Sequence, residues 1–260
     1  MSDLLSVEDR DAVRWLTISR PERMNAIPAD GWDELTDAFR AFEGSPARVL
    51  VLRGAGAAFS SGADLAEELD LETPSAADNL RQMHRTGQAA VALHRLPKPT
   101  IAAVDGVAVG AAMNLALGCD IVVASTRARF AEIFVRRGLG LDFGGSWLLP
   151  RLVGLARARE LALTGRMVRA DEALAMGMIG KMVEPEHLET TVGEIAAELA
   201  ANAPLATRFI KLALSRSSDF SFEQAIEHED QAQAVLLTSR DFAEGVAAFN
   251  ERRPPEFEGR

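Results

Sequence analysis

Two stretches of small residues follow apolar runs, and both could bring backbone N–H groups close to a ligand. The first is "AFSSGADL" (58–65), which follows "RVLVLRGAGA", and the second is "GAAMNLAL" (110–117), which follows "TIAAVDGVAV". Ligands of open parallel sheets bind at the carboxyl ends of strands, and a helix N-terminus carries partial positive charge. Two such N–H groups converging on one point form an oxyanion hole. Spacing alone leaves open the alternative that these small residues only permit close packing.

One carboxylate stands where the sequence favours proton transfer. Asp142 lies in "GLGLDFGGSW" (138–147), with Leu139, Leu141, Phe143 and Trp147 nearby. Burial among such side chains would raise its pKa from about 4 toward neutrality, which suits a group that takes up a proton and returns it. The alternative is a loop aspartate that accepts hydrogen bonds from neighbouring N–H groups.

Composition excludes several other classes. The chain has 260 residues, 38 acidic and 28 basic side chains and a net charge of −10, without a block of Lys or Arg. We therefore expect neither nucleic acid nor a membrane as a partner. Cys119 is the only cysteine, so an internal disulfide is impossible, and a cytoplasmic location is expected. The four histidines are scattered without metal-ligand spacing, so no metal site is predicted.

Apolar strand-like runs alternate with helical patterns over roughly residues 10–125. The runs "RVLVLRG", "TIAAVDG" and "IVVAS" predict buried strands, and "ADGWDELTDAFRAFEG" and "GAAMNLALGCD" predict helices. This alternation indicates an α/β fold with a parallel sheet covered on both faces. After Arg151 the patterns are mostly helical. We divide the chain into an α/β core (1–195) and a C-terminal helical region (196–260).

Several motifs, in order along nearly the whole chain, resemble the crotonase (enoyl-CoA hydratase/isomerase) superfamily. They are "SRPERMNAI", "AFSSGADL", "AAVDGVAVGAAMNLALGCDIVVAS", "GLDFGGSWLLPRLVG" and "EGVAAFNERRPPEF". The resemblance implies a spiral of ββα units followed by a helical trimerisation region. It also implies an acyl-CoA thioester as substrate, no additional cofactor, stabilisation of a thioester enolate, and assembly as a homotrimer or homohexamer.

The resemblance also assigns roles to individual residues. The N–H groups of Ala63 and Ala111 would be the oxyanion donors, and Gly62 and Gly110 would keep the backbone approachable. Asp64 would cap the following turn rather than act in catalysis. The coenzyme A loop of the family falls on Arg23, Met24 and Ala26, and Ser61 would also line the adenine site. Two further residues would reach the adenosine end from a neighbouring subunit: Phe249 and Arg252.

The sequence departs from the hydratases of this superfamily at two positions. Their two glutamates fall at Asn114 and Phe134 here, and Glu132 lies two residues away from the second position. Isomerase-type members instead use an aspartate at the place of Asp142. We therefore favour an enoyl-CoA isomerase that shifts a double bond between the 3,4 and 2,3 positions. Two alternatives stay open, a hydratase that adds water to a 2-enoyl-CoA and a non-catalytic acyl-CoA-binding protein.

The acyl pocket is less well defined by the sequence. Four apolar side chains could line it or could equally be plain core: Met83, Phe134, Leu139 and Trp147. The chain has no tyrosine, so a mechanism assisted by a tyrosine hydroxyl is excluded.

Overall fold

The computed structural model describes residues 4–68 and 75–260. Two sheets organise the described part of the chain. The large sheet has the order β1-β2-β3-β4-β6-β9, and all neighbours are parallel except β1 and β2. Its strands are β1 (Leu5–Arg10), β2 (Val13–Ile18), β3 (Val49–Gly54), β4 (Thr100–Val104), β6 (Ile121–Ser125) and β9 (Lys181–Val183). The small sheet has the order β5-β7-β8 and consists of β5 (Val107–Val109), β7 (Arg129–Ala131) and β8 (Val168–Arg169).

Alternation along the strands divides the core between the two faces of the large sheet. In β3, Val49 and Val51 face one cluster, and Leu50 and Leu52 face the other. Successive side chains of a strand point to opposite faces, so this apolar run is buried on both sides. The predicted parallel sheet with two covered faces is confirmed.

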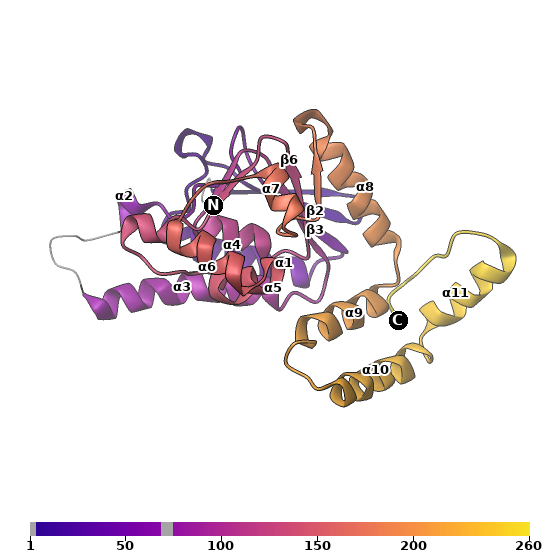
Figure 1. The fold of residues 1–260 in the computed structure, drawn as a ribbon. Helices are drawn as coiled ribbons and strands as arrows, with labels where there is room; N and C mark the ends of the chain where they lie inside the picture. Colours follow the sequence, from indigo (N-terminus) through magenta and orange to yellow (C-terminus); the bar gives the residue numbers. More distant parts are fainter. Residues whose placement is uncertain (1–3, 69–74) are drawn as a thin grey trace.

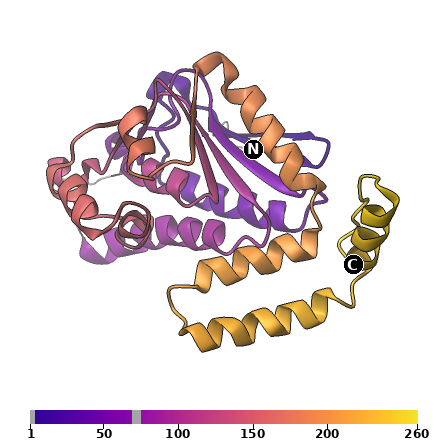
Figure 2. The ribbon, with the colours of Figure 1, turned by 45° about the vertical axis from the view of Figure 1, so that its right-hand side comes forward.

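Helices cover both faces of the large sheet (Figures 1 and 2). The face with the larger cluster is covered mainly by α1 (Gly31–Glu43), α3 (Ala76–His94) and α4 (Ala111–Leu117). The other face is covered by α8 (Leu188–Ala201). The shorter elements between them are η1 (Pro21–Arg23), α2 (Leu65–Glu68), η2 (Ile133–Arg137), α5 (Gly145–Val153), α6 (Leu155–Thr164), α7 (Ala170–Ala175) and η3 (Pro185–His187).

The last three helices form an extension that we call the C-terminal arm (residues 204–260). It contains α9 (Pro204–Arg216), α10 (Phe222–Leu236) and α11 (Arg240–Glu251), and it projects from the body of the molecule (Figures 1 and 2). The end of the arm returns to the core, where the Arg48 guanidinium donates to the carbonyls of Ala200 and Phe257. The boundary proposed at residue 195 lies inside α8, six residues before its end. No helix in residues 4–68 and 75–260 is long and apolar enough to cross a membrane.

Candidate active site

Backbone pairing brings the two small-residue stretches together. The Ser60 N–H donates to the Val107 carbonyl over 3.0 Å, and the Val109 N–H donates to the Ser60 carbonyl over 3.3 Å. Because of this pairing, a Cβ atom placed on Gly62 would lie 2.8 Å from the Val109 oxygen and 3.6 Å from the Ala111 nitrogen. The turn before Ala63 therefore lies directly against the start of α4.

The N–H groups of Ala63 and Ala111 have no hydrogen-bond partner among the residues that the structure describes. Ala111 is the first residue of α4, where backbone N–H groups have no partner within the helix. Both preceding glycines adopt positive φ angles, +87° at Gly62 and +58° at Gly110. This conformation is costly for a residue with a Cβ atom, so glycine is required at both turns. Two free donors on adjoining segments are the arrangement that an oxyanion hole needs.

A buried asparagine, which the sequence analysis missed, holds the turn in place. Asn25 donates from Nδ2 to the carbonyls of Ala55 and Ala58, over 2.8 and 2.7 Å. Its own carbonyl accepts a hydrogen bond of 2.7 Å from the Ser60 hydroxyl. Asn25 adopts a φ of +55°, and asparagine tolerates this left-handed region better than most residues.

The predicted coenzyme A loop lies beside this turn. The Ser61 N–H donates to the Met24 carbonyl over 2.9 Å, and the Ala26 N–H donates to the Arg23 carbonyl over 3.1 Å. Arg23 and Met24 are exposed, and Ala26 is buried. Asp64 is buried next to these residues. Its carboxylate accepts hydrogen bonds from the Arg20 guanidinium and from the Ala66 N–H, which is the structural role expected for it.

Two carboxyl groups and one amide meet at the start of α5. The Asn114 Nδ2 atom donates to Glu132 Oε2 over 3.3 Å and to the Asp142 backbone carbonyl over 3.0 Å. Gly145 makes this approach possible, because a Cβ atom there would lie 2.8 Å from Asn114 Cγ and Oδ1. One oxygen of each side chain, Asn114 Oδ1, Glu132 Oε1 and Asp142 Oδ1, is buried without a hydrogen-bond partner in the described part of the chain.

Burial makes both carboxyl groups hard to ionise. It raises the pKa of Asp142 to about 7, which is the change expected from its apolar surroundings. Burial also raises the pKa of Glu132 to about 8; the hydrogen bond from Asn114 opposes this rise, and the charge of Asp142 adds to it. Both groups thus titrate near neutral pH, as acid–base catalysts do.

Residues 8–260 match the sequence profile of the family described as enoyl-CoA hydratase/isomerase. The chain belongs to this family. It is 41% identical over 249 residues to a Rhodobacter capsulatus protein named "Probable enoyl-CoA hydratase", with 94% of each chain covered. It is 38% identical over 250 residues to the 1,2-epoxyphenylacetyl-CoA isomerase of Escherichia coli, with 95% of each covered. The crystal structure of enoyl-CoA hydratase from Bacillus anthracis superposes with a TM-score of 0.94 at 30% identity, covering 99% of this chain and 100% of that one.

These matches confirm the crotonase fold that the ordered motifs predicted. The family includes both hydratases and isomerases, so membership does not distinguish between the two reactions. The side chains at the site are therefore the better guide. Glu132, which lies two residues from the glutamate position expected in hydratases, belongs to the same cluster as Asp142.

The residues predicted to line an acyl pocket differ in exposure. Phe134 is buried, and its ring lies 3.7 Å from the position that a Cβ atom on Gly110 would occupy, so it adjoins the proposed oxyanion hole. Met83 and Leu139 are almost half exposed. Trp147 is half-buried, and its ring meets that of His94 edge-on at 5.2 Å.

Phe249 and Arg252 lie at the end of α11, on the C-terminal arm. In Figure 1 helix α11 of the arm and helix α2, which begins at Leu65, are on opposite sides of the molecule. The Phe249 side chain is 84% exposed. The structure therefore does not bring these two residues to Arg23 within one chain.

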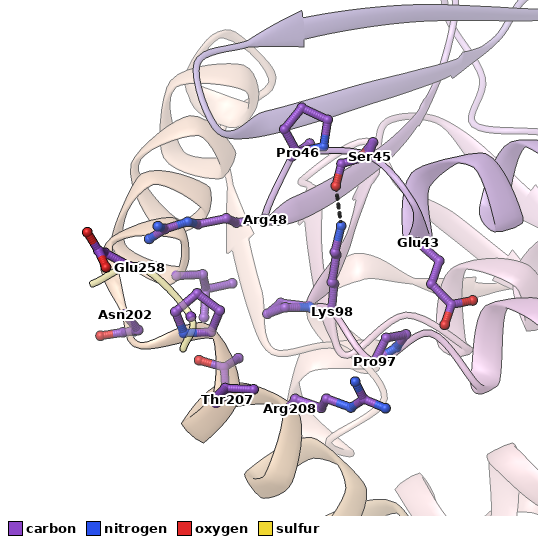
Figure 3. Close-up of a pocket in the computed structure, with 16 residues that line it drawn as sticks. Glu43, Ser45, Pro46, Arg48, Pro97, Lys98, Asn202, Thr207, Arg208 and Glu258 are labelled. Carbon is purple, nitrogen blue, oxygen red and sulfur yellow. Dashed lines mark hydrogen bonds between the residues drawn. The ribbon is translucent and has the colours of Figure 1, made fainter. Parts of the chain in front are cut away.

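Figure 3 shows a cavity of about 390 Å³ that is lined by none of the predicted site residues. Its lining includes residues 45–48 and 97–99, which precede β3 and β4, so the cavity is at the amino ends of the strands. The turn before Ala63 and the two carboxyl groups are at the carboxyl ends. Within residues 4–68 and 75–260, no group of three or more His, Cys, Asp or Glu side chains is arranged to hold a metal ion.

Proposed function

We propose that this chain is an enoyl-CoA isomerase that shifts the double bond of an acyl-CoA thioester between the 3,4 and 2,3 positions. In this proposal the N–H groups of Ala63 and Ala111 bind the thioester oxygen. Their hydrogen bonds stabilise the negative charge that develops there when a proton leaves the acyl chain. Asp142 moves the proton.

The observation that carries this proposal is the partly buried Asp142 carboxyl, which has an unpartnered oxygen and a pKa of about 7. Such a group is ionised often enough to take a proton and acidic enough to return it. The two positions where hydratases of the family carry glutamates hold Asn114 and Phe134, and neither side chain can act as a base. Double-bond migration consumes no water and can proceed without these glutamates.

The test is to incubate the protein with a 3-enoyl-CoA and, separately, a 2-enoyl-CoA in heavy water. Products are followed by NMR and mass spectrometry. Migration of the double bond without addition of water is the expected result. Binding of the thioester with neither migration nor proton exchange would contradict the proposal and would indicate a non-catalytic acyl-CoA-binding protein.

Hydration of a 2-enoyl-CoA is the second candidate function. It is favoured by the position of Glu132, because addition of water uses one group to activate the water and another for the α-proton. The R. capsulatus relative also carries a hydratase name. A 3-hydroxyacyl-CoA product that is lost on Glu132→Gln would establish this candidate instead.

We place the coenzyme A moiety along Arg23, Met24, Ala26 and Ser61 in this proposal. The exposed Phe249 and Arg252 would complete the adenosine site of a neighbouring copy in a homotrimer or homohexamer. The arm supports this arrangement because it presents large apolar side chains to solvent, including Leu214, Phe222 and Leu237. Light scattering of the purified protein measures the number of copies.

A further inference from the structure

Glu132 lies at the edge of the proposed oxyanion hole. The parallel pairing of β5 with β7 sets Val109 opposite Ala131, and the Gly110 N–H donates to the Ala131 carbonyl over 2.9 Å. The residue that follows β5 is therefore Gly110, and the residue that follows β7 is Glu132. Since Ala111 follows Gly110 directly, Glu132 is held close to the N–H group that would bind the thioester oxygen.

The environment of the Glu132 side chain lacks the partners that a structural carboxylate normally has. Glu132 is 1% exposed, its Oε2 accepts one long hydrogen bond from Asn114, and its Oε1 has no partner among the described residues. Asn114 is fully buried and also has an unpartnered oxygen. A buried polar atom without a partner costs about 1–3 kcal/mol, so such atoms are rare unless a ligand or water completes them.

We infer that Glu132 is a second catalytic acid of the isomerisation, which gives a proton to one carbon of the acyl chain while Asp142 takes a proton from another. This inference rests on the proposed function. One C–H bond breaks and its proton goes to the Asp142 carboxylate. The electron pair of the double bond shifts, the O–H bond of Glu132 breaks, and a new C–H bond forms. Transfer of the proton from Asp142 to Glu132, directly or through water, restores the starting state, so the reaction needs no oxidant and consumes no water.

The charged groups around Glu132 fit this division of roles. On η2, Arg136 donates to the Thr164 carbonyl and Arg137 is exposed. On α6, which packs against η2, Glu160 pairs with Arg166. Arg157 and Arg159 on the same helix are exposed, and α4 contributes no charged side chain. Burial is the main cause of the raised pKa of Glu132, and Asp142 is the charged group that adds to it when it is itself ionised.

A single-turnover experiment on the unmodified protein tests the inference first. Enzyme in excess is mixed in ordinary water with a 3-enoyl-CoA that is dideuterated at C2, and the 2-enoyl-CoA product is analysed by mass spectrometry. If two groups act, the proton delivered is not the one removed, so we expect no transferred deuterium at C4. Substantial transfer would show that one group moves the proton and would overturn the inference while leaving the proposed function intact. Absence of any migration would instead overturn the proposed function.

The variant Glu132→Gln provides the second measurement. We expect kcat to fall about 10²-fold, because an amide cannot give the proton, and deuterium transfer to appear because Asp142 must then return the proton that it took. The rate of the unmodified protein should fall above about pH 8 as Glu132 ionises, and the variant should lack this alkaline fall. The matched control is Glu194→Gln, an exposed position on α8, which should change none of these readouts. A Glu132→Gln enzyme with the original rate, label pattern and pH profile would overturn the inference.

Discussion

Polar groups at the amino ends of the large sheet differ in their hydrogen bonding from those at its carboxyl ends. At the amino ends, Lys98 donates to the carbonyls of Phe42 and Ser45, and Asp120 accepts hydrogen bonds from the Thr100 N–H, the Thr100 hydroxyl and Lys211 Nζ (Figure 3 shows the bond from Lys98 to Ser45). At the carboxyl ends, Glu132 and Asp142 each keep a buried oxygen without a partner in the described residues.

This difference separates structural polar groups from reactive ones. A polar group whose hydrogen bonds are made within the protein stabilises one conformation. A buried carboxyl with an unmade hydrogen bond has a pKa near neutrality and room for a substrate atom. The cavity of about 390 Å³ is at the amino ends, yet the groups that could do chemistry are at the carboxyl ends.

Among variants at the carboxyl ends of the strands, Asp142→Asn should cause the largest loss of activity. The variant keeps the shape of the side chain but cannot accept a proton, so we expect the isomerase rate to fall about 10³-fold. Affinity for a saturated acyl-CoA, measured by calorimetry, should change little. Asp37→Asn, at an exposed position on α1, is the matched control. An unchanged rate for Asp142→Asn would contradict the role of this aspartate.

The next largest effect should come from Gly62→Ala. The new Cβ atom would lie 2.8 Å from the Val109 oxygen, and the φ of +87° is strained for alanine. The Ala63 N–H would be displaced from its position beside Ala111, and loss of one oxyanion donor costs about 10²-fold in kcat. Initial rates measured together with the melting temperature separate this loss from simple unfolding.

The control for Gly62→Ala is Gly193→Ala, where the new Cβ atom would meet nothing within 4 Å. This second variant should keep its activity and its melting temperature. If Gly62→Ala also turns over normally, the turn before Ala63 is not part of the site.

The pH dependence of stability can sharpen the comparison. A carboxyl whose pKa rises from 4.5 to about 8 on folding binds more protons in the native state, so the free energy of unfolding falls as pH rises through this window. Glutamine does not titrate. Relative to the unmodified protein, Glu132→Gln should therefore gain about 4 kcal/mol of stability between pH 5 and pH 9, since each pKa unit corresponds to about 1.4 kcal/mol. Urea unfolding at both pH values measures the gain; an equal difference at pH 5 and pH 9 would contradict a raised pKa.

The sequence could predict one part of this site but not the other. The apolar runs around β3 and β4 are long enough to show burial on both faces, so the sheet and the two small-residue turns followed from them. The contact between Asn114 and Glu132 depends on pairing between β5 and β7, which have three residues each. Strands of three residues are too short to show a hydrophobic periodicity in the sequence. No local pattern therefore predicts that the carboxyl of Glu132 lies next to Gly110. Asn25 was missed for a similar reason, since its partners lie 30 and 33 residues away.

The smallest expected effect concerns the amino ends. Lys98→Met removes a charged donor and leaves the carbonyls of Phe42 and Ser45 without it, which should lower the free energy of unfolding by about 2 kcal/mol. The rate of isomerisation should stay within about twofold, because Lys98 precedes β4 and the proposed site lies at the other end of that strand. Lys181→Met, at an exposed position on β9, should change neither quantity. Lys98→Met could instead lose much of its rate and little of its stability. The amino ends of the strands would then also take part in the reaction, and the distinction between the two ends would fail.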